Sequence, residues 1–143
     1  MPAKVLSQYL DDSNQSTDWN SRYISLLLEE VSVSAYCNQS HDSSQRVARV
    51  LLEAFDNLPG GSEVTLTHSK LADLVGVRRE TVSLDLVKWA HMGIMSTKKG
   101  AIKIEQRERL SEIACDCYRH SIESRITALD LWKTIPWVCD DRQ

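Results

Sequence analysis

The chain has 143 residues and a formal net charge of −3, with 17 Lys and Arg against 20 Asp and Glu. This length allows one domain with a modest core, and 42% hydrophobic with 26% charged residues is ordinary for a globular protein. No apolar run approaches the ~18 residues that span a membrane, and the polar N-terminus does not have the pattern of a signal peptide. We therefore expect a cytoplasmic protein with no membrane partner.

The N-terminal part is predicted to be a flexible tail followed by a dimerisation-type helix. Residues 1–18 are rich in Asp, Ser, Asn and Gln, a composition typical of disorder. Residues 19–41 contain a helix that is predicted to begin at a cap on Asp18 or Asn20 and to end near Asn38. Its apolar stripe is expected to face the two-fold mate of a homodimer. The residues assigned to this interface are Tyr23, Leu26, Leu27 and Val31.

Residues 42–118 are predicted to form a winged-helix domain. Its first helix is expected to be capped by Ser43 or Ser44. The segment at residues 58–62 contains a proline and two glycines, which mark a break. Residues 64–66 are then a candidate strand that pairs with the wing.

The stretch at residues 67–89, THSKLADLVGVRRETVSLDLVKW, has the spacing of a helix-turn-helix. Leu71, Leu74 and Val75 fall at helical intervals and predict a buried stripe on a first helix that opens at a Thr cap. Gly76 can supply the left-handed conformation that a tight turn needs. On periodicity alone, an amphipathic helical hairpin with a solvated charged face explains this stretch about equally well.

The second helix, residues 78–89, is predicted to be the recognition helix. Val77, Val82 and Leu86 form its inward face, which leaves the polar residues of its first turn outside. In a major groove, arginine can pair with guanine and glutamate can accept from cytosine. The residues predicted to contact DNA from these two helices are Thr67, Ser69, Lys70, Arg78, Arg79, Glu80, Thr81 and Ser83.

A two-stranded wing is predicted after the recognition helix. Its strands are residues 94–96 and 101–105, and the turn between them places Lys98 and Lys99 where a phosphate backbone can pass. An ordinary solvated hairpin turn is the alternative, since lysines favour turns and edges. The wing makes the helical-hairpin interpretation of the preceding stretch less favourable.

The charge distribution agrees with a nucleic-acid partner. Residues 67–109 hold nine Lys and Arg against five Asp and Glu, a local charge of +4, while the remainder carries −7. An acidic protein can bind DNA if its basic groups converge on one face. So modest a local charge suits a few phosphate contacts combined with base readout.

The C-terminal part is predicted to be helical. Residues 106–120 are expected to form one helix and residues 121–136 another, within a C-terminal extension over residues 119–143. Ile122 and Ile126 fall on one stripe of the second helix. This extension is expected to pack either on its own domain or on a second subunit.

The cysteines and histidines do not predict a metal site. Cys115 and Cys117 are two apart on a predicted helix and should point to different faces. Cys37 and His41 are four apart, but the predicted end of their helix lies between them. Together with Cys139, and without a secretory signal, the cysteines are expected to be reduced, ordinary thiols. A metal or redox role is the minor alternative, and no cofactor is predicted.

No catalytic motif is present in the sequence. The five glycines cannot form G-x-G-x-x-G or a P-loop, and neither G-x-S-x-G nor H-E-x-x-H occurs. We therefore expect no catalytic residues and a protein that is not an enzyme.

Several runs resemble the C-terminal part of Crp/Fnr-type transcription regulators. These are VGVRRETV, the wing, QRERLSEIACDCY and the upstream SVSAYCNQSHDSSQRVARVLLEA, covering roughly residues 24–118. The resemblance implies that Arg79 and Glu80 touch base edges, and that Thr81 and Ser83 lie near phosphate and thymine.

The chain also departs from that family. Members usually carry an N-terminal β-roll that binds an effector, and nothing before the helix at residues 23–36 can form such a roll. A third groove-facing arginine of the best-known members is Leu84 here, which predicts a different operator preference. Asp85 replaces a small apolar residue, so its carboxylate should lie at the edge of the helix packing or cost stability if buried.

The sequence therefore predicts a mainly α fold with a small β-wing, in a sequence-specific regulator that binds double-stranded DNA. A homodimer mate is the expected protein partner, and RNA polymerase is a further candidate. The alternative is a protein-interaction module that modulates a full-length Crp/Fnr-like regulator or RNA polymerase without reading DNA. Such an adaptor has no reason to keep Arg78, Arg79 and Glu80 together with a lysine-tipped wing, which favours DNA binding.

Overall fold

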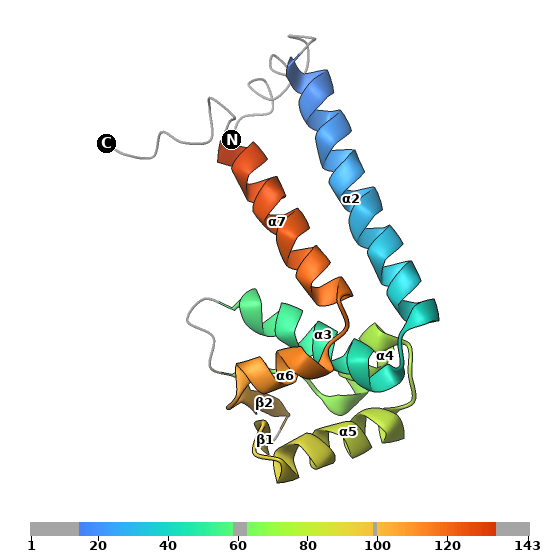
Figure 1. The fold of residues 1–143 in the computed structure, drawn as a ribbon, viewed down its shortest axis with the longest axis vertical. Coiled ribbons are helices and arrows are strands. Elements are labelled where there is room, and N and C mark those ends of the chain that lie inside the picture. The colour runs from blue at the N-terminus through green and yellow to red at the C-terminus, as the bar shows by residue number, and fades with distance from the viewer. Residues whose placement is uncertain (1–14, 59–62, 99, 134–143) are drawn as a thin grey trace, which may run out of the picture.

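The computed structural model consists of helices and one small sheet (Figure 1). Over the described residues the chain forms six helices and one two-stranded antiparallel sheet, which confirms the predicted fold class. Among these residues, none of the helices combines the length and the apolarity needed to cross a membrane. Residues 1–14 of the predicted tail, Lys99 and Cys139 lie outside the described part of the chain. The described residues are 15–58, 63–98 and 100–133.

Two long helices form an arm that projects from the other elements. They are α2, Gln15–Ser40, and α7, Cys117–Lys133, and they lie side by side in Figure 1. Glu29 of α2 contacts α7 twice, through Nε2 of His120 at 3.1 Å and the hydroxyl of Ser124, which donates at 2.8 Å. The described part of the predicted C-terminal extension, up to Lys133, thus packs on α2 of its own chain.

Both predicted ends of the first long helix need correction. α2 begins at Gln15, so Asp18 and Asn20 lie inside the helix and neither caps it, and residues 15–18 are not part of a tail. The helix does not end near Asn38 but continues to Ser40, and the amide of His41 still donates to the carbonyl of Cys37 at 3.2 Å. No Gly or Pro interrupts this stretch before Asp42 begins the next helix.

The next helix, α3, spans Ser43–Asp56. Its N-cap residue is Asp42, so the predicted cap at Ser43 or Ser44 is wrong. Asp42 Oδ1 accepts from the amide of Gln45 at 2.9 Å, and Gln45 Oε1 accepts from the amide of Asp42 at 3.3 Å. This capping box satisfies two amides at once, which a single serine hydroxyl cannot do. The buried apolar residues on this helix are Val47, Ala48, Leu51 and Leu52.

The helix-turn-helix consists of α4, His68–Val75, and α5, Arg79–His91. As predicted, Thr67 caps α4, where its hydroxyl accepts from the amide of Lys70 at 3.2 Å. Gly76 closes the helix with φ of 69°, a left-handed conformation that suits glycine.

The predicted buried stripe of α4 is correct for Leu71 and Val75 but wrong for Leu74, which is 64% exposed. At about 100° per residue, Leu71, Ala72 and Val75 share one arc of the helix and Leu74 falls outside it. The small Ala72, not Leu74, completes the buried face.

The wing consists of β1, Met95–Lys98, and β2, Ala101–Ile104, which pair antiparallel. Ile102 of β2 is buried and Lys103 is exposed. Val64 exchanges two backbone hydrogen bonds with Ile102, at 2.7 and 2.9 Å, so the predicted third strand is reduced to a single bridge.

The C-terminal helices divide differently from the prediction of one helix over residues 106–120 and another over 121–136, which is wrong. α6 spans Arg107–Ile113 and ends at Ala114, whose backbone is extended with φ of −66° and ψ of 153°. α7 then begins at Cys117 and continues without a break across the predicted boundary between residues 120 and 121.

A buried polar contact explains why the chain bends there. Tyr118 is only 7% exposed, and its hydroxyl donates to Asp56 Oδ2 at 2.6 Å, while Arg107 Nη2 donates to Asp56 Oδ1 at 2.8 Å. Burial and the hydrogen bond to Asp56 raise the pKa of Tyr118 to about 12. The bend at Ala114 brings this tyrosine into the core beside α3.

Candidate nucleic-acid interface

The core fixes the orientation of α5. Val82, Leu86 and Trp89 point inward and are at most 1% exposed. They belong to one cluster with the buried residues of α3 and α4 and with Ile94 and Ile102. Because one side of α5 is anchored in this way, its opposite side is a surface of fixed geometry.

The first turn of α5 presents charged side chains that are not engaged elsewhere. Arg78 is the N-cap residue but makes no capping bond through its side chain, and Arg79 and Glu80 follow it on the surface. Within the described part of the chain, none of the three forms an ion pair or a side-chain hydrogen bond. Glu80 lies in the first turn, where the negative charge of a carboxylate interacts favourably with the helix dipole.

Thr81 and Ser83 are less accessible than the resemblance implies, because both are half-buried. The hydroxyl of Ser83 lies 2.9 Å from Nδ1 of His68, at the start of α4. This contact links the two helices of the motif, so Ser83 has a structural partner in addition to its predicted place near DNA.

The start of α4 and the wing carry the predicted phosphate-binding lysines. Lys70 is exposed in the first turn of α4, beside exposed Ser69, while the hydroxyl of Thr67 is used as the cap. Lys98 is exposed at the end of β1. Lys103 also lies on the wing, but its Nζ is paired with Glu105 at 2.9 Å.

Two apolar side chains complete the outer surface of α5. Leu84 is 72% exposed and Val87 is 53% exposed. Exposed apolar groups on a helix that enters a major groove can contact the methyl group of thymine. Val87 was not part of the predicted site, although its position three residues after Leu84 places both on one side of the helix.

Asp85 lies where α5 meets the start of α3, and it is half-buried. Its Oδ1 accepts from the hydroxyl of Ser44 at 3.0 Å, whereas its Oδ2 is buried and has no partner among the described residues. Ser44 belongs to the first turn of α3, whose dipole favours a nearby carboxylate. This position offsets part of the cost that the sequence predicts for burying Asp85.

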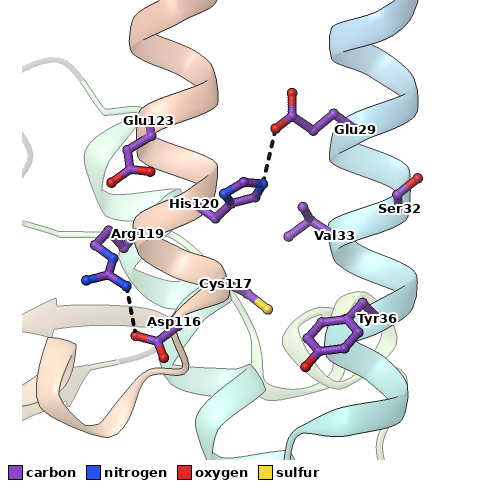
Figure 2. A pocket seen from close by; sticks show the side chains of 9 residues that line it. All are labelled: Glu29, Ser32, Val33, Tyr36, Asp116, Cys117, Arg119, His120 and Glu123. Atoms are coloured by element: carbon purple, nitrogen blue, oxygen red, sulfur yellow. Dashed lines mark ion pairs between the residues drawn. The ribbon is translucent and has the colours of Figure 1, made fainter.

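The arm carries a cleft of its own, about 500 Å³ in volume, between α2 and α7 (Figure 2). His120 and Glu29 meet across it at 3.1 Å, and Ser124 donates to the same carboxylate. The contacts therefore run from serine to carboxylate to imidazole, and not in the serine–imidazole–carboxylate order that activates a nucleophile.

The helix-turn-helix and its wing match a known protein family. Residues 45–113 match the family model of the Crp-like helix-turn-helix domain. A search of curated proteins found no match.

Solved structures of transcription regulators share this fold over part of their length. A transcriptional regulator of the CRP/FNR family from Thermus thermophilus is 26% identical, with a TM-score of 0.60, over 66% of this chain and 51% of that one. FixK2 from Bradyrhizobium japonicum shares the fold at 21% identity, with a TM-score of 0.69, over 78% of this chain and 58% of that one. The chain thus spans about half the length of the first of these structures. The resemblance to the C-terminal part of Crp/Fnr-type regulators is confirmed by the match of residues 45–113 to the Crp-like helix-turn-helix domain.

Proposed function

We propose that this protein is a transcription regulator that binds duplex DNA sequence-specifically, with α5 in the major groove. The observation that carries the proposal is the first turn of α5, where Arg78, Arg79 and Glu80 are exposed and unengaged among the described residues. Side chains of these types read base edges when a rigid helix holds them in a groove. The buried opposite side of α5 supplies that rigidity.

The phosphate backbone is expected to pass between α4 and the wing. A lysine in the first turn of a helix opposes the helix dipole, so Lys70 is unfavourable unless an anion lies nearby. A DNA phosphate at this N-terminus satisfies both the free amides and the lysine. Lys98 and Lys99 would approach the same backbone from the wing.

The lysines give a test of duplex binding. Replacing Lys70, Lys98 or Lys99 by alanine should flatten the dependence of log Kd on log salt by about one unit of slope each, because each removes one phosphate contact. The change should be the same for duplexes of different sequence. Fluorescence anisotropy with a labelled mixed-sequence duplex over a range of salt concentrations measures the slope.

Lys103→Ala is the matched control, since this lysine lies on the wing but is paired with Glu105. It should leave the slope nearly unchanged. If the triple variant at the three predicted lysines keeps the wild-type slope, α4 and the wing do not contact phosphate. If the wild-type protein does not bind duplex DNA at any salt concentration, the interaction-module alternative replaces the present proposal.

We infer further that α2 holds two copies together. The surface of α2 carries a run of exposed apolar side chains, which is costly unless a partner covers it. Leu26 is half-buried and lies on the side of α2 that carries Glu29, so it faces α7 more than a partner. Two copies would present two recognition helices to half-sites about 34 Å apart or a multiple of that distance. The exposed apolar residues are Tyr23, Ile24, Leu27, Leu28 and Val31.

A charge placed in this surface should separate the two copies. Leu27→Asp is expected to shift the protein from dimer to monomer at micromolar concentration, because the carboxylate would be buried without a partner. Sedimentation velocity measures the shift. Ser25→Asp adds the same charge at another exposed position of α2 and should leave the dimer intact. A wild-type protein that is monomeric throughout the micromolar range would contradict the inference.

A further inference from the structure

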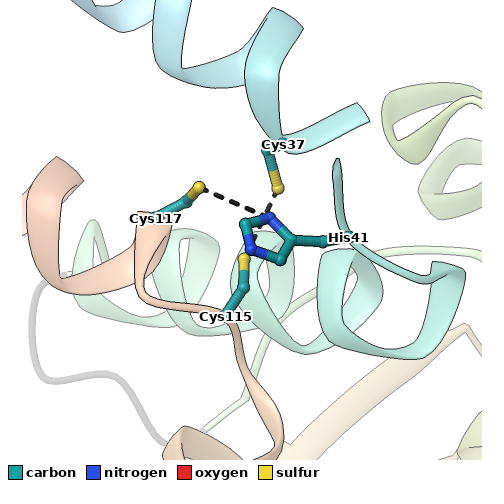
Figure 3. Close-up of side chains that lie close together, drawn as sticks. All are labelled: Cys37, His41, Cys115 and Cys117. Carbon is teal, nitrogen blue, oxygen red and sulfur yellow. Dashed lines mark hydrogen bonds between the residues drawn. The ribbon is translucent and has the colours of Figure 1, made fainter. Parts of the chain in front are cut away.

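Three sulfur atoms and one imidazole converge where the arm meets the helix-turn-helix domain (Figure 3). They come from the last turn of α2, the residue that follows α2, the link between α6 and α7, and the first residue of α7. All four potential ligand atoms lie within 4.8 Å of one another. The residues of this cysteine–histidine cluster are Cys37, His41, Cys115 and Cys117.

We propose that the cysteine–histidine cluster binds one structural zinc ion, which joins the arm to the helix-turn-helix domain. Three cysteines and one histidine are a recognised ligand set for structural zinc, in which four protein ligands close a tetrahedral site. Soft thiolates with imidazole select zinc over the hard cations that prefer oxygen.

The distances in the cluster fit a single ion. With Zn–S near 2.3 Å and Zn–N near 2.0–2.1 Å, ligand atoms at the corners of a tetrahedron lie about 3.5–3.8 Å apart. Cys37 Sγ and Cys115 Sγ are 3.5 Å apart, and Cys117 Sγ is 3.6 Å from Nδ1 of His41. An iron–sulfur cluster contains several iron atoms and is normally held by four cysteines. A set of three cysteines and one histidine therefore fits it less well.

The surroundings of the cluster also suit a metal site. Cys37, Cys115 and Cys117 are at most 6% exposed and form no disulfide. Cys37 Sγ contacts Cys115 Sγ, and Cys117 Sγ contacts the ring of His41. Tyr36 lies edge-on to the ring of His41, with 5.6 Å between the centroids, and helps to hold the imidazole in place.

A buried cation accompanies the cluster. Arg49 is 7% exposed; its Nη1 pairs with Glu53 at 3.0 Å, and its Nε has no hydrogen-bond partner among the described residues. Three thiolates, one imidazole and Zn²⁺ together carry a charge of about −1. Arg49 interacts electrostatically with Cys37 and Cys115. Because Arg49 already pairs with Glu53, it would offset the charge of the occupied site only in part.

An entry path leads to the cluster from the cleft of the arm. Cys117 lines that cleft together with Val33 and Tyr36, and Figure 2 shows its sulfur directed toward α2. Cys37 and Cys115 are buried and do not line the cleft. An ion entering between α2 and α7 meets Cys117 first.

The prediction that these residues do not form a metal site rested on helix boundaries that the structure corrects. Cys115 and Cys117 are not on opposite faces of one helix, because the chain is bent between α6 and α7. Cys37 and His41 stay one helical turn apart, because α2 continues to Ser40 and the amide of His41 still donates to the carbonyl of Cys37. The two pairs meet although Cys37 and Cys115 are 78 positions apart in the sequence.

Metal analysis and cobalt substitution test the proposal without reference to DNA binding. The purified full chain should contain about one zinc per chain by mass spectrometry of the metal content. After zinc removal under reducing conditions, added Co²⁺ should produce the visible bands of a tetrahedral site and the charge-transfer bands of thiolate ligands. Zinc removal should also lower Tm, because the ion binds only the folded chain.

Variants identify the ligands. Cys115→Ser should abolish cobalt binding, whereas Cys139→Ser and His91→Asn, which change the same residue types elsewhere, should keep it. Cys117→His exchanges one zinc ligand for another and should keep the metal with weaker thiolate bands, which separates loss of a ligand from loss of folding. The proposal is overturned if the reduced wild-type chain takes up neither Zn²⁺ nor Co²⁺. It is equally overturned if Cys115→Ser binds cobalt like the wild type, or if the purified protein holds iron and sulfide instead.

Discussion

Replacing Trp89 by alanine is expected to lower the free energy of unfolding by about 3–5 kcal/mol. Trp89 is 1% exposed and is the largest fully buried side chain of the described residues. It packs in the cluster that joins α5 to α3 and the wing, and its carbonyl accepts from the amide of Ile94 at 2.9 Å. Since domains of this size are stable by only about 5–15 kcal/mol, the loss is a large share of the total.

Urea unfolding measures this effect, and Val87→Ala is the matched control. Val87 lies two residues earlier on α5 and is 53% exposed, so truncating it should change stability by no more than about 0.5 kcal/mol. If the two variants unfold at the same urea concentration, the core does not anchor α5 and does not fix the geometry of the recognition surface.

Replacing Arg79 by alanine is expected to weaken binding to the preferred duplex by about 1–3 kcal/mol, roughly 5- to 150-fold. Its side chain is exposed at the first turn of α5 and has no partner among the described residues, so the substitution should not destabilise the fold. The variant should also discriminate less at one base pair, because a bidentate contact with a base edge has been removed.

Competition with duplexes changed at single positions measures both quantities. Arg125→Ala removes the same charge from α7, on the arm away from α5 in Figure 1, and should keep the wild-type affinity and preference. An Arg79 variant that is weaker by the same factor on every sequence would show a phosphate contact in place of base readout.

The helix-turn-helix could be predicted from sequence because its signals are local. The hydroxyl of Thr67, the left-handed Gly76 and the buried periodicity of α5 each act within a few residues. The inward positions Val82 and Leu86 place the first turn of α5 on the surface, so the exposed position of Arg79 followed from the pattern. Leu74 shows the limit, since the arc of a short helix that faces the core depends on which neighbour covers it.

The features that the sequence did not predict depend on contacts between distant segments. The bend at Ala114 has no Gly or Pro to mark it, and it is held by Tyr118 reaching Asp56 across 62 positions. Likewise, the cysteine–histidine cluster forms only once α2 and α7 are paired as an arm. Spacing rules for metal motifs describe ligands close in sequence, so a set assembled by tertiary structure escapes them.

Selection of bound duplexes from a random pool tests the central claim, that α5 reads DNA sequence in a two-fold complex, most directly. Wild-type protein and Arg79→Ala should be selected in parallel. We expect the wild type to enrich a half-site present twice in inverted orientation, with centres about 34 Å apart or a multiple of that distance. The variant should lose preference at one base pair of each half-site. Selection that enriches no sequence, or the same sequence equally strongly for both proteins, would contradict the claim.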